Sequence, residues 1–243
     1  MSLLKTCQNF AKQDNNILNI ILYGSRARGD FKKTSDYDII FIIKSPIKSP
    51  NKEYKIKQHY ENQIARKLKI DEHLIQTSIW PLKMFKEEHK KGNSFVYCTL
   101  RDGKILYSKQ KLNLKQPKNS QKAAVDRLNF AKRNITNIEF SLKHLKKHKI
   151  SNFDIEHLGY SSMHLCWTVC MFNNFYPISK YTILKECKKY FTTKQFKNIK
   201  KTYNLYATQN SYKNIKKKTF IKLFKSLKKT IKITEKKYKK QNI

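Results

Sequence analysis

Two short groups of residues in the first fifth of the chain have the types and spacing of a phosphate- and metal-binding site. Gly24 and Ser25 follow an apolar run, and glycine lets the backbone approach a ligand closely. After a gap of ten residues, Asp36 and Asp38 begin a second apolar run. Because side chains alternate along a strand, both carboxylates are expected on one face, with Tyr37 on the other. Two carboxylates beside a phosphate cradle favour Mg²⁺ that is shared with nucleotide phosphates.

Each half of this pattern also has a simpler interpretation. Residues 24–25 alone are compatible with a plain turn, and residues 36–38 alone with an exposed strand start. A P-loop is excluded because Asp30 and Phe31 stand where that motif needs Lys and Ser or Thr. The two halves together, each next to an apolar run, favour the nucleotide site.

The elements that must position these residues form an α/β pattern over residues 1–110. Runs rich in Ile, Leu, Val, Phe and Tyr predict strands, and the segments between them have helical periodicity. We predict strands at 16–23, 36–44, 70–79 and 104–107, a helix at 53–68 and a short helix opened by Pro81. This is the pattern of a small mixed-sheet domain.

The chain changes character after the polar segment 108–119, which contains Pro117 and is expected to be a linker. The pattern beyond it is helical throughout, which predicts an all-α, up-and-down bundle over residues 120–243. The expected helices lie at 120–147, 154–173, 178–191, 193–206 and 213–240.

Residues 22–41, LYGSRARGDFKKTSDYDIIF, resemble the signature of the polymerase-β-type nucleotidyltransferase superfamily. That signature is an apolar residue, Gly and Ser, a gap of about ten residues, then Asp, apolar, Asp and apolar. The GSRARGD start and the two-domain layout are similar to minimal nucleotidyltransferase domains joined to a helical domain of the HEPN or kanamycin-nucleotidyltransferase C-terminal type. The resemblance covers residues 17–107 well and residues 120–240 more weakly.

The resemblance implies a magnesium-dependent attack of an acceptor hydroxyl on the α-phosphate of a nucleoside triphosphate (NTP), with release of pyrophosphate. Two Mg²⁺ ions and the NTP phosphates would be bound by residues from the signature. The implied nucleotide-binding residues are Gly24, Ser25, Arg26 and Arg28, and the implied metal ligands are Asp36 and Asp38.

The family also has a third carboxylate on a following strand, and here the sequence departs from the pattern. Alignment of Trp80 and of the segment RDGKILY at 101–107 with the usual strand ending puts Ile75 at that position. Asp71 has the same strand parity as Ile75, so it is the predicted third catalytic residue beside Asp36 and Asp38. If no acid reaches the site, metal binding rests on two ligands.

The helical half is expected to shape the acceptor site. In related enzymes it sometimes supplies an acid that takes the acceptor's proton, and Asp154 and Glu156 are the best-placed candidates here. Capping of the helix N-terminus is the favoured interpretation of both residues. An RNase function is not expected, because no His follows Arg127 or Arg133 at the spacing of the RNase motif.

The charge of the chain bears on the acceptor. The net charge is +36, and residues 111–243 contain 32 Lys and Arg against six Asp and Glu. Two interpretations of this excess compete, compositional drift and a polyanionic partner. An aminoglycoside is a polycation, so the charge favours RNA or a protein as acceptor. The alternatives are antibiotic modification, and a nucleic-acid-binding or toxin–antitoxin partner protein whose transferase site has decayed.

The compartment is predicted from two absences in the sequence. No apolar run approaches the roughly 18 residues of a membrane helix, and residues 1–12 lack the apolar core of a signal peptide. The five cysteines are scattered, which argues against a disulfide framework. We therefore expect a cytoplasmic protein.

Overall fold

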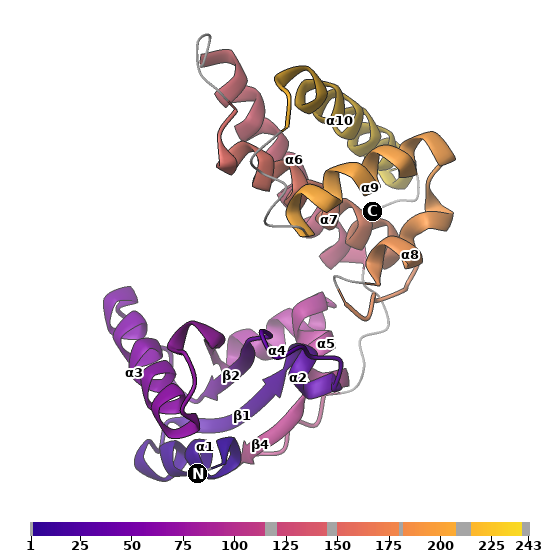
Figure 1. Ribbon diagram of the computed structural model, residues 1–243. Coiled ribbons are helices and arrows are strands. Elements are labelled where there is room, and N and C mark those ends of the chain that lie inside the picture. Colours follow the sequence, from indigo (N-terminus) through magenta and orange to yellow (C-terminus); the bar gives the residue numbers. More distant parts are fainter. Residues whose placement is uncertain (1, 115–120, 145–149, 180–181, 208–214, 240–243) are drawn as a thin grey trace. The chain divides into compact units, whose positions relative to one another are not determined.

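The computed structural model describes residues 2–114, 121–144, 150–179, 182–207 and 215–239, which form two compact units, Met1–Lys118 and Asn119–Ile243 (Figure 1). Pro117 of the expected linker lies outside the described residues, as do parts of several expected helices, at 120, 145–147, 180–181, 213–214 and 240. Within the described helices, no stretch has the length and hydropathy that a membrane span requires.

A four-stranded mixed sheet forms the centre of the first unit. The strands are β1 (Ile17–Tyr23), β2 (Tyr37–Ile43), β3 (Ile75–Pro81) and β4 (Lys104–Ser108), in the order β3-β2-β1-β4. β1 is antiparallel to β2 and to β4, whereas β3 is parallel to β2. β1 and β2 are buried along most of their length, as expected for apolar strands covered on both faces. The predicted mixed-sheet fold class is confirmed.

Helices cover both faces of this sheet. On one face α1 (Leu3–Gln13) and α3 (Pro50–Leu68) pack against side chains such as Phe41. On the other face α4 (Leu82–Lys90) and α5 (Ser94–Asp102) pack against Ile40 and Ile42. Side chains at even positions of β2 therefore lie on the α4 and α5 side, which is also the side of Asp38.

The third strand differs from its prediction at its beginning. It starts at Ile75 rather than at residue 70, because a short 3₁₀ helix, η1 (Glu72–Leu74), precedes it. The Asp71 carboxylate accepts a hydrogen bond from the backbone N–H of His73 (2.9 Å) and caps this turn. Asp71 is thus not part of the strand, and the parity argument that connected it with Ile75 is wrong.

β3 is an edge strand, and a side chain from α3 occupies part of its edge. The Glu61 carboxylate accepts hydrogen bonds from the backbone N–H and from the hydroxyl of Thr77, at 2.8 and 2.9 Å. Thr77 itself is 4% exposed. Glu61 therefore satisfies a buried hydroxyl and an edge amide at once.

The second unit is all-helical, with α7 (Asn152–Phe172) at its centre and buried on nearly all sides. α6 (Gln121–His144), α9 (Thr193–Ala207) and α10 (Lys217–Lys239) pack around it (Figure 1). The expected helix at 178–191 is instead the short α8 (Ile183–Cys187) followed by the 3₁₀ helix η2 (Lys188–Tyr190).

Asp154, one of the two candidate acids of this unit, is a helix cap. Its carboxylate accepts hydrogen bonds from the hydroxyl and backbone N–H of Ser151, and the Ser151 hydroxyl accepts from the Asp154 N–H. The side chain is 2% exposed and also accepts from the Ser141 hydroxyl. The favoured capping interpretation of this residue is therefore confirmed.

A charged and a titratable side chain meet in the core between α6 and α7. The Arg127 guanidinium donates to Nδ1 of His164 (3.2 Å) and lies over the ring of Trp167. Because arginine has no acceptor, His164 must accept through Nδ1 and carry its proton on Nε2. Burial, together with the Arg127 charge, lowers the pKa of His164 to about 3.

Because His164 is buried in its neutral form, we expect the second unit to lose stability in acid. The pKa of His164 is about 3 in the folded state and about 6.5 in an unfolded chain, so the unfolded state binds the proton first. Stability that is fully present above pH 6.5 is lost as the pH falls towards 3, by about 2 kcal/mol at pH 5. This loss of unfolding free energy is measured by following Trp167 fluorescence during urea unfolding of a Trp80→Phe variant. His164→Gln serves as the matched control and should remove most of the change between pH 6.5 and 5.

Candidate active site

A sharp change of direction at Gly24 connects β1 to the short helix α2 (Gly24–Arg28). Gly24 has φ +73°, in the left-handed region that glycine tolerates best. A Cβ atom built on Gly24 would collide with the carboxylate of Asp38. The turn therefore lies directly against one of the two predicted metal ligands, and glycine is required there for both backbone conformation and space.

The two aspartates lie where β2 begins. Asp38 is paired with Tyr23 across the β1–β2 ladder, and Asp36 stands just before the strand. Both side chains are partly exposed. The structure therefore brings Gly24 together with Asp38, at an end of the sheet where a ligand can reach the carboxylates.

Arg26, expected to contact phosphate, is held within the loop that leads to the aspartates. Its Nε and Nη2 donate to the backbone carbonyl of Ser35, at 3.0 and 2.7 Å. Its guanidinium also lies 3.7 Å from the ring centre of Tyr37, in cation–π contact. In this structure Arg26 ties α2 to residues 35–37, which supports the position of Asp36.

Arg28 is also engaged locally. Its Nη2 forms an ion pair with Asp30 at 3.2 Å, and its side chain is 18% exposed. Ser25 remains partly exposed at the start of α2, and its backbone carbonyl accepts from Gly29. Phosphate contacts by Ser25, Arg26 and Arg28 remain predictions.

The register between β2 and β3 changes which residue occupies the position of the family's third carboxylate. Ile75, the residue aligned there from sequence, pairs with Tyr37 and is buried in the α1 and α3 face. Gln76 pairs with Asp38, and paired residues of parallel strands project to the same side. The position beside Asp38 on the neighbouring strand is therefore occupied by the exposed amide of Gln76, not by an acid.

Two hydroxyl side chains also lie at this end of the sheet and were missed from sequence. Tyr23 and Ser78 form a hydrogen bond with each other. Burial, with a contribution from the charge of Asp38, raises the pKa of Tyr23 to about 12, although the bond to Ser78 acts in the opposite direction. Tyr23 is therefore a neutral hydroxyl beside the carboxylates. In the sequence, its place directly before Gly24 at the end of the first apolar run was the available signal, and its pairing with Asp38 follows from the β1–β2 register.

The donor set fits a magnesium ion shared with a nucleotide. Among the described residues, no group of three or more His, Cys, Asp or Glu side chains has the arrangement of a metal site. Mg²⁺ commonly uses one or two carboxylates and takes its other ligands from water and substrate phosphates. Asp36 and Asp38 satisfy that requirement, and the Gly24 turn packs directly against the Asp38 carboxylate.

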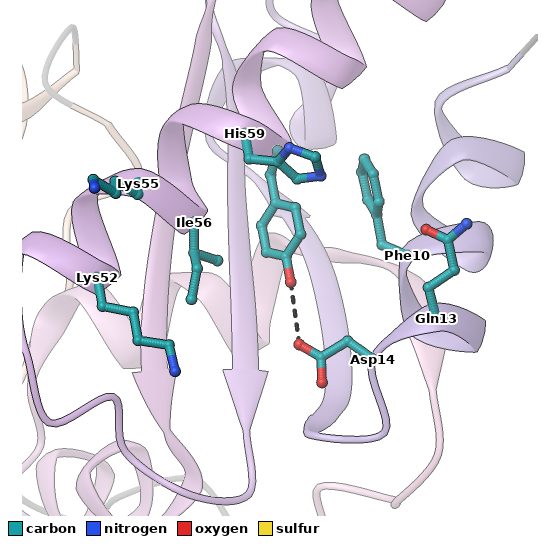
Figure 2. Close-up of a pocket in the computed structure, with 8 residues that line it drawn as sticks. Phe10, Gln13, Asp14, Lys52, Lys55, Ile56 and His59 are labelled. Atoms are coloured by element: carbon teal, nitrogen blue, oxygen red, sulfur yellow. Dashed lines mark hydrogen bonds between the residues drawn. The ribbon is translucent and has the colours of Figure 1, made fainter.

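The pocket drawn in Figure 2 is a different feature. It has a volume of about 330 Å³ and lies between α1 and α3, where the Tyr60 hydroxyl donates to Asp14 (3.3 Å) and His59 lines one wall. An adjoining cavity of about 500 Å³ reaches Ile43 at the end of β2. Asp38 is five residues away at the start of β2, roughly 17 Å along the strand. These cavities are separate from the predicted site.

Comparison with known proteins agrees with this geometry. Residues 5–112 match the family described as "Polymerase beta, Nucleotidyltransferase". The fold is similar to that of a spectinomycin adenyltransferase, AAD(9) from Enterococcus faecialis, solved with ATP and spectinomycin. That similarity has a TM-score of 0.52 at 14% sequence identity, and it covers 93% of this chain and 98% of the other. No curated protein sequence matches the chain.

Proposed function

We propose that this protein is a magnesium-dependent nucleotidyltransferase, because residues 5–112 match the polymerase beta nucleotidyltransferase family. It moves a nucleoside monophosphate from an NTP to a hydroxyl of an acceptor and releases pyrophosphate. The observation that carries this proposal is the close packing of Gly24, at positive φ, against Asp38. That contact puts the predicted phosphate turn and a predicted metal ligand in one place.

Each predicted residue then has a defined task. The turn at Gly24 and Ser25 binds the β- and γ-phosphates, while Asp36 and Asp38 hold Mg²⁺. The metal, when bound, neutralises phosphate charge and polarises the α-phosphate. Arg26 keeps the loop before Asp36 in place through its bonds to Ser35.

Substitution of Gln76, at the position of the family's third carboxylate, tests the metal site directly. In Gln76→Glu a carboxylate replaces the amide beside Asp38, and an added charged ligand raises cation affinity. The Mg²⁺ concentration for half-maximal NTP binding should fall by about tenfold. Gln76→Ala should stay within about threefold of wild type. An unchanged magnesium requirement in Gln76→Glu would show that residue 76 does not face the metal, and loss of activity in Asp71→Asn would support Asp71 as the third acid.

RNA or a protein hydroxyl is the favoured acceptor. The second unit lies in a segment with 32 basic and six acidic residues, and a positive surface attracts anionic partners. A polycationic drug is expected to prefer an acidic pocket.

Antibiotic modification is the second candidate function. The AAD(9) fold extends over nearly the whole chain, helical unit included, and that enzyme is a spectinomycin adenyltransferase. A third candidate, a binding protein with a decayed transferase site, is favoured by the amide of Gln76 at the third position.

One transfer assay separates these candidates. The protein is incubated with Mg²⁺ and each α-labelled NTP, and with RNA, protein extract or spectinomycin in turn. Label on RNA or protein supports the favoured proposal, whereas label on spectinomycin supports the second candidate. If no label moves in any mixture, the transferase proposal fails and the decayed-site candidate remains.

A further inference from the structure

Helices α9 and α10 lie side by side in the second unit and together present a basic surface. The Asn198 amide donates to the Ser226 hydroxyl (2.8 Å), which joins the two helices. Thirteen exposed lysines project from these two helices, and nine of them make up the basic surface. We define the lysine face as Lys194, Lys197 and Lys201 on α9 with Lys218, Lys222, Lys225, Lys229, Lys232 and Lys236 on α10.

The six lysines of α10 form one straight row. They recur at alternating intervals of four and three residues, which places them on a single side of a helix. From Lys218 to Lys236 the row is roughly 27 Å long, at 1.5 Å per residue. The opposite side of α10, which includes Phe220 and Leu227, is buried in the unit. The row is therefore the outermost line of the helix.

The acidic residues near α10 form their ion pairs with other lysines, although the charge of Lys232 in the row also contributes to lowering the pKa of Glu139. Glu235, the one acid of α10, binds Lys132 of α6 (2.7 Å) and Lys239 (3.1 Å), and Glu139 of α6 binds Lys228 (2.5 Å). These ion pairs lie on the side of α10 that faces α6. Within the described part of the chain, none of the nine lysines of the lysine face forms an ion pair.

Such a row is unfavourable for the free protein. Neighbouring like charges three or four residues apart on a helix repel each other and destabilise it. Phosphates bound along the row remove that repulsion and release counterions. A bound polyanion therefore stabilises the second unit more than a single small anion does.

From this arrangement we infer that the lysine face docks RNA through its phosphate backbone, without reading bases. The aromatic residues of α10, Phe220, Phe224 and Tyr238, are all buried, so stacking on unpaired bases is not provided. A membrane surface is disfavoured because the apolar side of α10 is packed inside the unit. The choice of RNA over other polyanions rests on the proposed function, in which RNA is one of the two favoured acceptors.

The test uses the full chain and a labelled RNA stem-loop in EDTA without NTP, so that binding is independent of catalysis. Fluorescence anisotropy measures affinity at several salt concentrations. One variant removes four charges from the row, and a control removes four exposed lysines elsewhere in the second unit. The row variant is Lys→Gln at 222, 225, 229 and 232, and the control is Lys→Gln at 122, 143, 185 and 188.

The row variant should bind RNA at least about tenfold more weakly and lower the slope of log affinity against log salt by about three. The control should change the slope by less than about one, and a second stem-loop of unrelated sequence should bind wild type equally well. Melting temperatures of both variants at or above wild type confirm folding.

Three results would overturn the inference. They are equal losses in the row variant and the control, tighter binding of a DNA duplex of the same sequence, and row-dependent binding to phosphatidylserine vesicles in place of RNA. Asp38→Asn should bind RNA like wild type. If the wild-type protein transfers nucleotide but does not bind RNA in EDTA, only this inference is refuted. If the wild-type protein binds RNA through the row but transfers nothing, only the proposed function is refuted.

Discussion

Asp38→Asn is expected to reduce nucleotidyl transfer by about 10³-fold or more while leaving the protein folded. The substitution keeps the shape of the side chain but removes the charge that holds Mg²⁺ next to the Gly24 turn. Transfer of an α-labelled NTP to the acceptor measures the loss. Binding of a non-hydrolysable NTP should lose its magnesium dependence in the same variant.

Asp30→Asn is the matched control for this prediction. Asp30 lies in the segment that connects α2 to β2, carries the same charge as Asp38 and forms an ion pair with Arg28. Because exposed ion pairs contribute little, its transfer rate should stay within about fivefold of wild type. Comparable losses in both variants would mean that Asp38 has no special role in the reaction.

Gly24→Ala should be nearly as damaging, for a steric reason. Alanine at φ +73° costs roughly 1–2 kcal/mol of stability, and its Cβ must displace the Asp38 carboxylate. A displacement of about 1 Å in a catalytic group is sufficient for a 10²-fold loss. Transfer rate and chemical denaturation, measured on the same preparation, separate the two effects.

Gly29→Ala isolates the backbone cost alone. Gly29 also has positive φ, at +92°, but a Cβ there meets no atom within 4 Å. This variant should lose similar stability and keep transfer within about tenfold of wild type. If Gly24→Ala retains activity as well as Gly29→Ala does, the close contact with Asp38 has no functional importance.

Three of the four strands were predictable because each contains a short apolar run with few alternative interpretations. β1, β2 and β4 lie within one residue of the positions expected from their apolar runs. α1 was not predicted, although Cys7, Phe10 and Ala11 follow helical spacing and are buried, and Ser2 caps the helix. A short amphipathic helix contains few apolar residues, so its helical periodicity is easily overlooked in the sequence.

The candidate site was predictable only where it is local in sequence. Gly24, Asp36 and Asp38 lie within fifteen consecutive residues, so spacing and strand parity were sufficient. The neighbour of Asp38 on β3 depends on the register between two strands separated by a helix. A shift of one residue exchanges the two faces of a strand, and it was such a shift that led to Ile75 instead of Gln76.

The contact between Glu61 and Thr77 protects the edge strand β3 against pairing with strands of other molecules. An exposed edge strand is a template on which strands of other molecules assemble, because its outward amides seek partners. At β3 one of these amides is bound by a carboxylate from α3. A second chain that added a β-strand there would have to break this hydrogen bond. The buried hydroxyl of Thr77 would then be left without its acceptor. The double variant Thr77→Val with Glu61→Ala would therefore leave the edge amide of residue 77 free to pair with a strand of another molecule.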